Sequence, residues 1–213
     1  MSEPILEQSG DVVRVSPRGG AWELTLDARR GVALDALSVG GTTVAQGSRF
    51  HADDCGDAFG VPGPCRDFRK TGAAVVSGGT VLPFGAEIAI ARTWRVAANH
   101  ARVTADVKWP RSTPVQRHVG LDGLWLPGRW QSFRCVPPLQ HLFEGALPFD
   151  RAIPDFDGER LMIGHWHRPP LALVFRNEDG LDLEIGTGDD VWRWEQSLGH
   201  GPESGSYKIF LCD

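Results

Sequence analysis

Hydrophobic and polar residues alternate with a period of two along most of this chain. In "AWELTLDARRG", Trp22, Leu24 and Leu26 occupy one set of alternate positions, and polar residues occupy the other set. This period is typical of a strand that buries one of its two faces. The alternation therefore predicts a half-buried strand that begins near Trp22.

The same pattern returns along the sequence between short turns rich in glycine and proline. "GVALDALSVGGTTV" predicts two strands joined by a tight hairpin turn at Gly40 and Gly41. Residues 86–109 predict two long strands joined at "AANH", because the stretch alternates cleanly and is rich in Val, Ile and Thr. No segment shows helical periodicity over three turns with credible caps.

These segments predict roughly twelve to fifteen strands, judged by the spacing of the turns. So many strands suit two packed sheets better than one flat sheet. The chain has 213 residues, of which 41% are hydrophobic, so it can bury a sizeable core. We therefore expect an all-β protein that folds as a single-domain antiparallel β-sandwich over residues 1–213.

Charge and hydropathy exclude several classes of partner. The net charge of -5 and the sequence pI of about 5.8 argue against a nucleic-acid partner. No apolar run approaches the roughly 18 residues that span a bilayer, so no membrane partner is expected. The start "MSEPILEQSGDVV" lacks the basic and apolar regions of a signal peptide, which predicts a cytoplasmic protein unless a leader precedes this sequence.

The four cysteines show no CxxC spacing of the kind that structural zinc sites use. Free thiols are expected in the cytoplasm, whereas a Cys55–Cys65 disulfide is expected only in an exported protein. The tryptophan content is more unusual, because the chain has 8 Trp against 1 Tyr. Tryptophans either fill a core or form a flat platform with an N–H group at its edge.

The segment "GTGDDVWRWEQ" at residues 186–196 combines two tryptophans with several charged residues. With the alternating "GLDLEIG" before it, the segment predicts an amphipathic hairpin that turns at "TGDD". Trp192 and Trp194 then share one face, and Arg193 and Glu195 share the other. Two interpretations fit this pattern. Either the tryptophans fill the core and the charges are solvated, or the charged face lines a sugar site in which Arg193 keeps Glu195 ionised.

"GHWHRPP" places His165 and His167 on one face of a predicted strand. These histidines fit a metal site if His141 or Glu144 supplies a third ligand. They also fit proton transfer, recognition of sugar hydroxyls, or hydrogen-bonded structural positions. A divalent metal is not the favoured interpretation, and the pattern identifies no cofactor.

"GLWLPGRWQSFRC" brings tryptophans and arginines together around residue 130. The segment contains Trp125, Trp130, Arg129 and Arg134. An arginine beside a tryptophan suits a cation–π pair that stabilises the fold, and it equally suits contacts to an anionic sugar. The segment "DDCGD" offers carboxylates but not the pattern of a dedicated calcium loop.

The opening "WELTLDARRGVALDALSVGGTTV", from Trp22 to Val44, resembles the first strands of galactose mutarotase-like β-sandwiches. The resemblance implies a large sandwich architecture, with a galactose mutarotase-like supersandwich as one form of it, and sugar ligands. The loops "NxLHG" and "NHxYxN" expected of mutarotases are absent from this chain, so the resemblance assigns no catalytic residue.

Together these patterns predict a carbohydrate-active enzyme that acts on a glycosidic bond or an anomeric centre by general acid–base catalysis. Glu195 is the expected base or nucleophile, Asp190 its partner, and His165 or His167 the proton donor. The expected substrate-binding residues are Trp130, Trp192, Trp194, Arg193, Arg134 and His141.

Two other functions fit the same residues. One is a non-catalytic carbohydrate-binding module or accessory subunit, in which tryptophans hold the sugar without a pair of reacting carboxylates. The other is a structural sandwich that forms homo-oligomers through exposed tryptophans. For the enzyme and for the binding module alike, the expected partner is a small-molecule carbohydrate.

Overall fold

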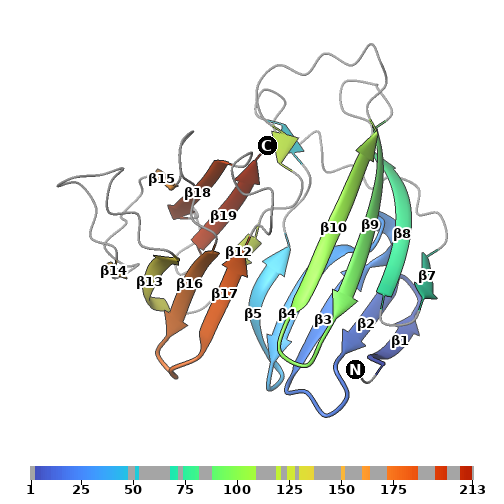
Figure 1. The fold of residues 1–213 in the computed structure, drawn as a ribbon, viewed down its shortest axis with the longest axis horizontal. Helices are drawn as coiled ribbons and strands as arrows, with labels where there is room; N and C mark the ends of the chain where they lie inside the picture. Colours follow the sequence, from blue (N-terminus) through green and yellow to red (C-terminus); the bar gives the residue numbers. More distant parts are fainter. Residues whose placement is uncertain are drawn as a thin grey trace. The chain divides into compact units, whose positions relative to one another are not determined.

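A computed structural model describes residues 3–47, 51–52, 68–71, 74–81, 88–108, 119–120, 124–127, 130–136, 150–151, 160–163, 172–186, 195–200 and 207–212. The chain forms two compact units, Met1–Asp122 and Gly123–Asp213 (Figure 1). Two such units are compatible with one sandwich domain or with two small domains. The single-domain organisation therefore stays a prediction, and each unit is described by itself.

The described residues contain nineteen strands and one short 3-10 helix, and none of them belongs to an α-helix. Neighbouring strands within each unit run antiparallel. This arrangement confirms the all-β, antiparallel prediction. The strand number exceeds the expected one partly because β6 (His51–Ala52), β11 (Val119–Gly120) and β14 (Asp150–Arg151) are too short to leave a sequence pattern.

The first layer of unit 1 contains a meander of five consecutive antiparallel strands. Its members are β1 (Ile5–Ser9), β2 (Val12–Ser16), β3 (Trp22–Asp27), β4 (Ala33–Val39) and β5 (Thr42–Gly47). The predicted alternation of β3 is confirmed, because Leu24 and Leu26 are buried whereas the residues between them are partly exposed. Their cross-strand neighbours Val15 and Val13 are fully buried on the same face.

The predicted turn at Gly40 and Gly41 is confirmed as well. Val39 pairs with Thr42, so the two glycines alone connect β4 to β5. Their φ values are 57° and 82°, which is the left-handed region that this type of two-residue hairpin turn requires at both positions. Glycine adopts this region without steric cost, so the turn follows directly from the sequence.

The second sheet of unit 1 has the order β10-β9-β8-β7. Its strands are β7 (Phe68–Thr71), β8 (Ala74–Val81), β9 (Ile88–Val96) and β10 (Ala101–Lys108). The long pair β9–β10 confirms the two strands predicted within residues 86–109, and the backbone N–H of Ala97 closes their turn on His100 O over 2.9 Å.

The two sheets of unit 1 share a core to which both contribute buried side chains. Trp94 and Val96 of β9 are each 6% exposed, and the inward residues of β2 and β3 are at most 3% exposed. Two long-range hydrogen bonds join the layers, because the indole N–H groups of Trp22 and Trp94 donate to carbonyls of Ala98 and Val32, respectively.

Unit 2 also contains two antiparallel groups of strands. The first has the order β14-β13-β16-β17, with β13 at Trp130–Val136, β16 at Ala172–Asn177 and β17 at Asp182–Gly186. The second contains β12 (Leu124–Leu126), β15 (Arg160–Ile163), β18 (Glu195–His200) and β19 (Tyr207–Cys212). Within it β18 pairs with both β15 and β19, and β19 pairs with β12.

The turn and most of the second strand of the hairpin predicted across "TGDD" lie at residues 187–194, outside the described residues. In the structure β17 pairs with β16, whereas β18, which begins at Glu195, pairs with β15 and β19 (Figure 1). A tight turn after β16 explains the first pairing, because the Asn177 side chain accepts hydrogen bonds from the backbone N–H groups of Asp179 and Leu181. Gly180 completes this turn with a φ of 79°.

The faces predicted for residues 181–186 are nevertheless those observed. Asp182 and Glu184 are exposed, and Leu183 and Ile185 alternate with them as half-buried positions. No helix among the described parts of the chain has the length and apolar character needed to cross a membrane.

Candidate functional site

Most of the residues expected at the site lie outside the described residues. These residues are Asp190, His165, His167, His141, Trp192, Trp194 and Arg193. Their expected catalytic, substrate-binding or metal-binding roles stay predictions. Glu195, Arg134 and Trp130 lie in described strands, so the structure places each of them in a sheet.

Trp130 begins β13 and packs in the core of unit 2, where it is 3% exposed. Its indole N–H donates to the carbonyl of Pro127 over 3.2 Å. Its ring meets Phe175 edge to face, with a centroid distance of 6.1 Å and an interplanar angle of 77°. Phe175 is fully buried, so this contact stabilises the core. In this conformation Trp130 presents almost no surface on which a sugar could stack.

Arg134 also lies in β13, and two neighbours flank its position. The register pairs it with Val174 of β16 on one side and with Asp150 of β14 on the other. Opposite charges at directly paired positions stabilise antiparallel strands. The position therefore suits an ion pair within the sheet as well as the predicted contact to an anionic sugar.

Glu195 is the first residue of β18 and pairs with Cys212 of β19. Residues that alternate along a strand share a face, and so do directly paired residues of antiparallel strands. Glu195 therefore shares one face of this sheet with Ser197 and Gly199 of its own strand and with Phe210 of β19. We call this surface the Glu195 face.

The opposite face of the same sheet is the more apolar one. Its positions include Leu161, Leu198, Ile209, Leu211 and Leu126, as the register of β15, β18, β19 and β12 requires. Leu126 is fully buried, whereas its neighbour Trp125, on the Glu195 face, is half-buried. This leucine-rich side also includes Gln196, His200 and Tyr207, whereas the charged residues Arg160, Glu195 and Lys208 lie on the Glu195 face.

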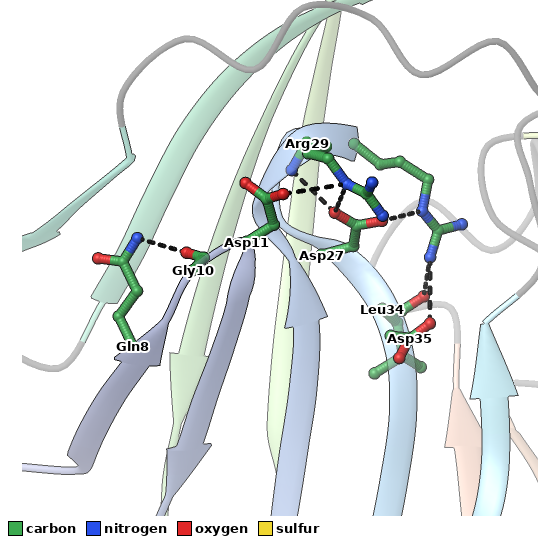
Figure 2. Close-up of polar contacts among 8 residues, drawn as sticks. Gln8, Gly10, Asp11, Asp27, Arg29, Leu34 and Asp35 are labelled. Atoms are coloured by element: carbon green, nitrogen blue, oxygen red, sulfur yellow. Dashed lines mark hydrogen bonds and ion pairs between the residues drawn. The ribbon is translucent and has the colours of Figure 1, made fainter.

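A polar network surrounds the 3-10 helix η1 (Ala28–Arg30) in unit 1 (Figure 2). The carboxylate of Asp27 accepts the backbone N–H of Arg29 at 2.8 Å and Nε of Arg30 at 3.0 Å. Nε of Arg29 also lies 3.5 Å from a carboxylate oxygen of Asp11. Arg30 reaches the Leu34 carbonyl at 3.4 Å and the Asp35 carboxylate at 3.5 Å.

This network is structural in character. Each of its carboxylates lies beside an arginine, and the Asp27 side chain caps the first turn of η1. Asp35 is the extra residue of a bulge between β3 and β4, which brings its carboxylate near Arg30. The arrangement holds a turn in place and does not set two carboxylates free for acid–base work.

Strand β9, which belongs to the second sheet of unit 1, donates hydrogen bonds to the turn that follows η1. The buried Arg92 donates from Nη1 to the carbonyl of Arg30 over 3.1 Å, and the Trp94 indole donates to Val32 O over 2.7 Å. Val32 is fully buried and has a φ of 48°, which is a strained conformation for a β-branched residue. Sequence patterns contain no signal for this contact, because it joins residues about sixty positions apart.

Three described tryptophans thus use their N–H groups within the protein. Trp22, Trp94 and Trp130 each donate to a backbone carbonyl. The core interpretation of the high tryptophan content holds for Trp94 and Trp130. Any sugar platform is therefore to be sought among the other tryptophans.

The described residues contain no group of three or more His, Cys, Asp and Glu side chains arranged to hold a metal ion. A scan against protein-family models and a search of curated proteins gave no match to this chain. The galactose mutarotase-like resemblance therefore stays a prediction.

Proposed function

We propose that this protein recognises a carbohydrate and that Glu195 is the acid–base group of its site. The supporting observation is the position of Glu195. It opens β18 directly after the "WRW" segment, and it lies on the face of the sheet opposite the leucine-rich side. Indole rings stack on the apolar C–H face of a sugar, and a carboxylate accepts hydrogen bonds from its hydroxyl groups.

Catalysis on a glycosidic bond would follow if a second carboxyl group lies near Glu195. Retaining hydrolysis needs two carboxyl groups about 5 Å apart, and inverting hydrolysis needs them about 6.5–9.5 Å apart. Asp190 is the proposed partner, and His165 or His167 is the proposed proton donor. Acid–base catalysis of this kind typically contributes 10²–10⁴-fold to the rate.

A specific observation favours a second candidate, a non-catalytic carbohydrate-binding protein. Among the described residues of β12, β15, β18 and β19, Glu195 is the only acidic residue on its face. A single carboxylate suits hydrogen bonding to a sugar, whereas hydrolysis requires a pair.

Titration with a panel of neutral and acidic mono- and oligosaccharides, followed by intrinsic tryptophan fluorescence, tests the proposal. A saturable change with one sugar is expected, and its absence across the panel contradicts carbohydrate recognition. The bound sugars and their aryl glycosides then serve as substrates for Glu195→Gln. Loss of turnover supports the enzyme, full turnover by the variant excludes Glu195 as its acid–base group, and binding without turnover by the wild type supports the second candidate.

A further inference from the structure

One cross-strand row on the Glu195 face combines two cations, a glycine and a tryptophan. Arg160 of β15 pairs with Gly199 of β18, Gly199 pairs with Lys208 of β19, and Lys208 pairs with Trp125 of β12. The four residues therefore follow one another across four adjacent strands. Because directly paired residues share a face, all four positions lie on the face that includes Glu195.

The spacing of this row leaves an interval between the two cations. Neighbouring strands lie about 4.8 Å apart, so the backbone positions of Arg160 and Lys208 are about 10 Å apart. Gly199 occupies the position between them and has no side chain. A glycine at such a position allows a ligand to approach the strand backbone closely.

The charge of this face differs from that of the whole protein. Its described positions are Arg160, Met162, Glu195, Ser197, Gly199, Lys208, Phe210, Cys212 and Trp125. Two cations and one carboxylate give these positions a positive balance, whereas the chain has a net charge of -5. Glu195 is four residues from the row along β18, a distance of about 13 Å at 3.3 Å per residue.

We infer that the row Arg160–Gly199–Lys208–Trp125 binds an acidic saccharide, with the carboxylate of the sugar between Arg160 and Lys208 and a sugar ring at Trp125. This inference rests on the proposed carbohydrate function and names its ligand class. Arginine binds carboxylates in a bidentate manner, and lysine adds a compact second charge. The tryptophan next to Lys208 supplies a surface for the C–H face of a ring.

Calorimetric titration of the full chain with trigalacturonate, and with the neutral galactotriose of the same linkage, tests the inference. We expect the acidic trisaccharide to bind at least tenfold more tightly at low salt, because each charge-assisted contact is worth about tenfold in affinity. Arg160→Gln and Lys208→Gln should each weaken binding of trigalacturonate about tenfold and leave galactotriose within about twofold.

Arg14→Gln is the matched control. Arg14 is an exposed cation of β2 whose Nε lies 3.6 Å from Glu23, and it belongs to the other unit. Its replacement removes the same charge and should leave both affinities unchanged. An equal loss of affinity in Arg14→Gln would assign the preference to overall charge and overturn the inference.

Gly199→Val provides an independent variant that keeps both cations. A side chain at this position fills the interval, so binding of trigalacturonate should fall below detection while the far-UV spectrum stays that of the wild type. Wild-type affinity in a folded Gly199→Val protein contradicts the inference, even if Arg160→Gln and Lys208→Gln fail to fold.

The outcomes separate the two proposals. Equal affinity for the acidic and neutral sugars overturns the acidic ligand class and leaves carbohydrate recognition supported. Binding of neither sugar, together with no response in the fluorescence panel, contradicts both. Binding of single-stranded DNA as tightly as trigalacturonate at the same salt concentration also overturns the inference, because the face would then recognise polyanions in general.

Discussion

The indole N–H of Trp94 donates to the carbonyl oxygen of Val32 over 2.7 Å, and both residues are buried. This hydrogen bond joins β9 to a residue whose φ of 48° is unfavourable for valine. The bond and the surrounding packing maintain a backbone conformation that local sequence preferences disfavour. The contact therefore contributes to the association of the two sheets in unit 1.

Trp94→Phe should destabilise the protein by about 2 kcal/mol, because it leaves a buried carbonyl without its donor and removes part of a packed ring. Urea denaturation followed by far-UV circular dichroism measures this change. Trp22→Phe is the matched control, since its hydrogen bond to Ala98 is exposed. Its cost should stay below about 1 kcal/mol, and equal costs for the two variants would argue against a special role for the buried bond.

Asp27→Ala should destabilise unit 1 by about 1–2 kcal/mol, because it removes the cap of η1 and one partner of Arg30. Asp11→Ala removes a carboxylate whose side chain is 61% exposed, from a single contact of 3.5 Å. That variant should change stability by less than about 0.5 kcal/mol. Thermal and urea unfolding measure both effects. If Asp11→Ala destabilised the protein as much as Asp27→Ala, the conclusion that Asp27 contributes most to this network would be contradicted.

Gly40→Asn and Gly40→Val should differ in stability, although a side chain at this position has open space around it. A Cβ atom at Gly40 has nothing within 4 Å, so the cost of substitution comes from the φ of 57° alone. Asparagine tolerates this region and valine does not, so Gly40→Val should be less stable by about 1 kcal/mol or more. Melting temperatures of the two variants give the comparison, and equal values would contradict the turn geometry.

Arg176 should stay protonated between pH 5 and pH 9, so its ion pair with Asp182 should not be lost through deprotonation of the arginine in this range. Two contacts of 2.7 Å join them across β16 and β17. The hydrogen bond to Asp182 and its charge raise the pKa of Arg176 above its ordinary value. A raised pKa of a basic group stabilises the folded state at all pH values below the unfolded pKa, and this stability is lost only as pH rises through the folded pKa.

Because both side chains are largely exposed, salt should weaken this pair more than pH does. The difference in melting temperature between the wild type and Arg176→Gln should therefore be small and should shrink from low to high salt. Measurements at pH 6 and pH 9 should give the same difference. A marked decrease of this difference at pH 9 would contradict the assignment of the raised pKa.

The sequence by itself determined which residues of a strand share a face and where several turns lie. The alternation in Trp22–Asp27 and in residues 181–186 predicted the observed faces, because side-chain direction has a period of two in any strand. Gly40 and Gly41 predicted their turn, because glycine adopts positive φ without cost. Glu195 was also predicted to lie in a strand, and it is the first described residue of β18.

Only the tertiary structure decided which strands are partners. The alternation of residues 181–186 does not distinguish β16 from β18 as a neighbour, since backbone hydrogen bonds are the same for every sequence. For the same reason the row from Arg160 to Trp125 could not be predicted, because it depends on the register of β12 and β15 against the consecutive strands β18 and β19, from which both are distant in the chain. The positive φ of Val32 likewise contradicts its local preference, and burial together with the bond from Trp94 maintains it.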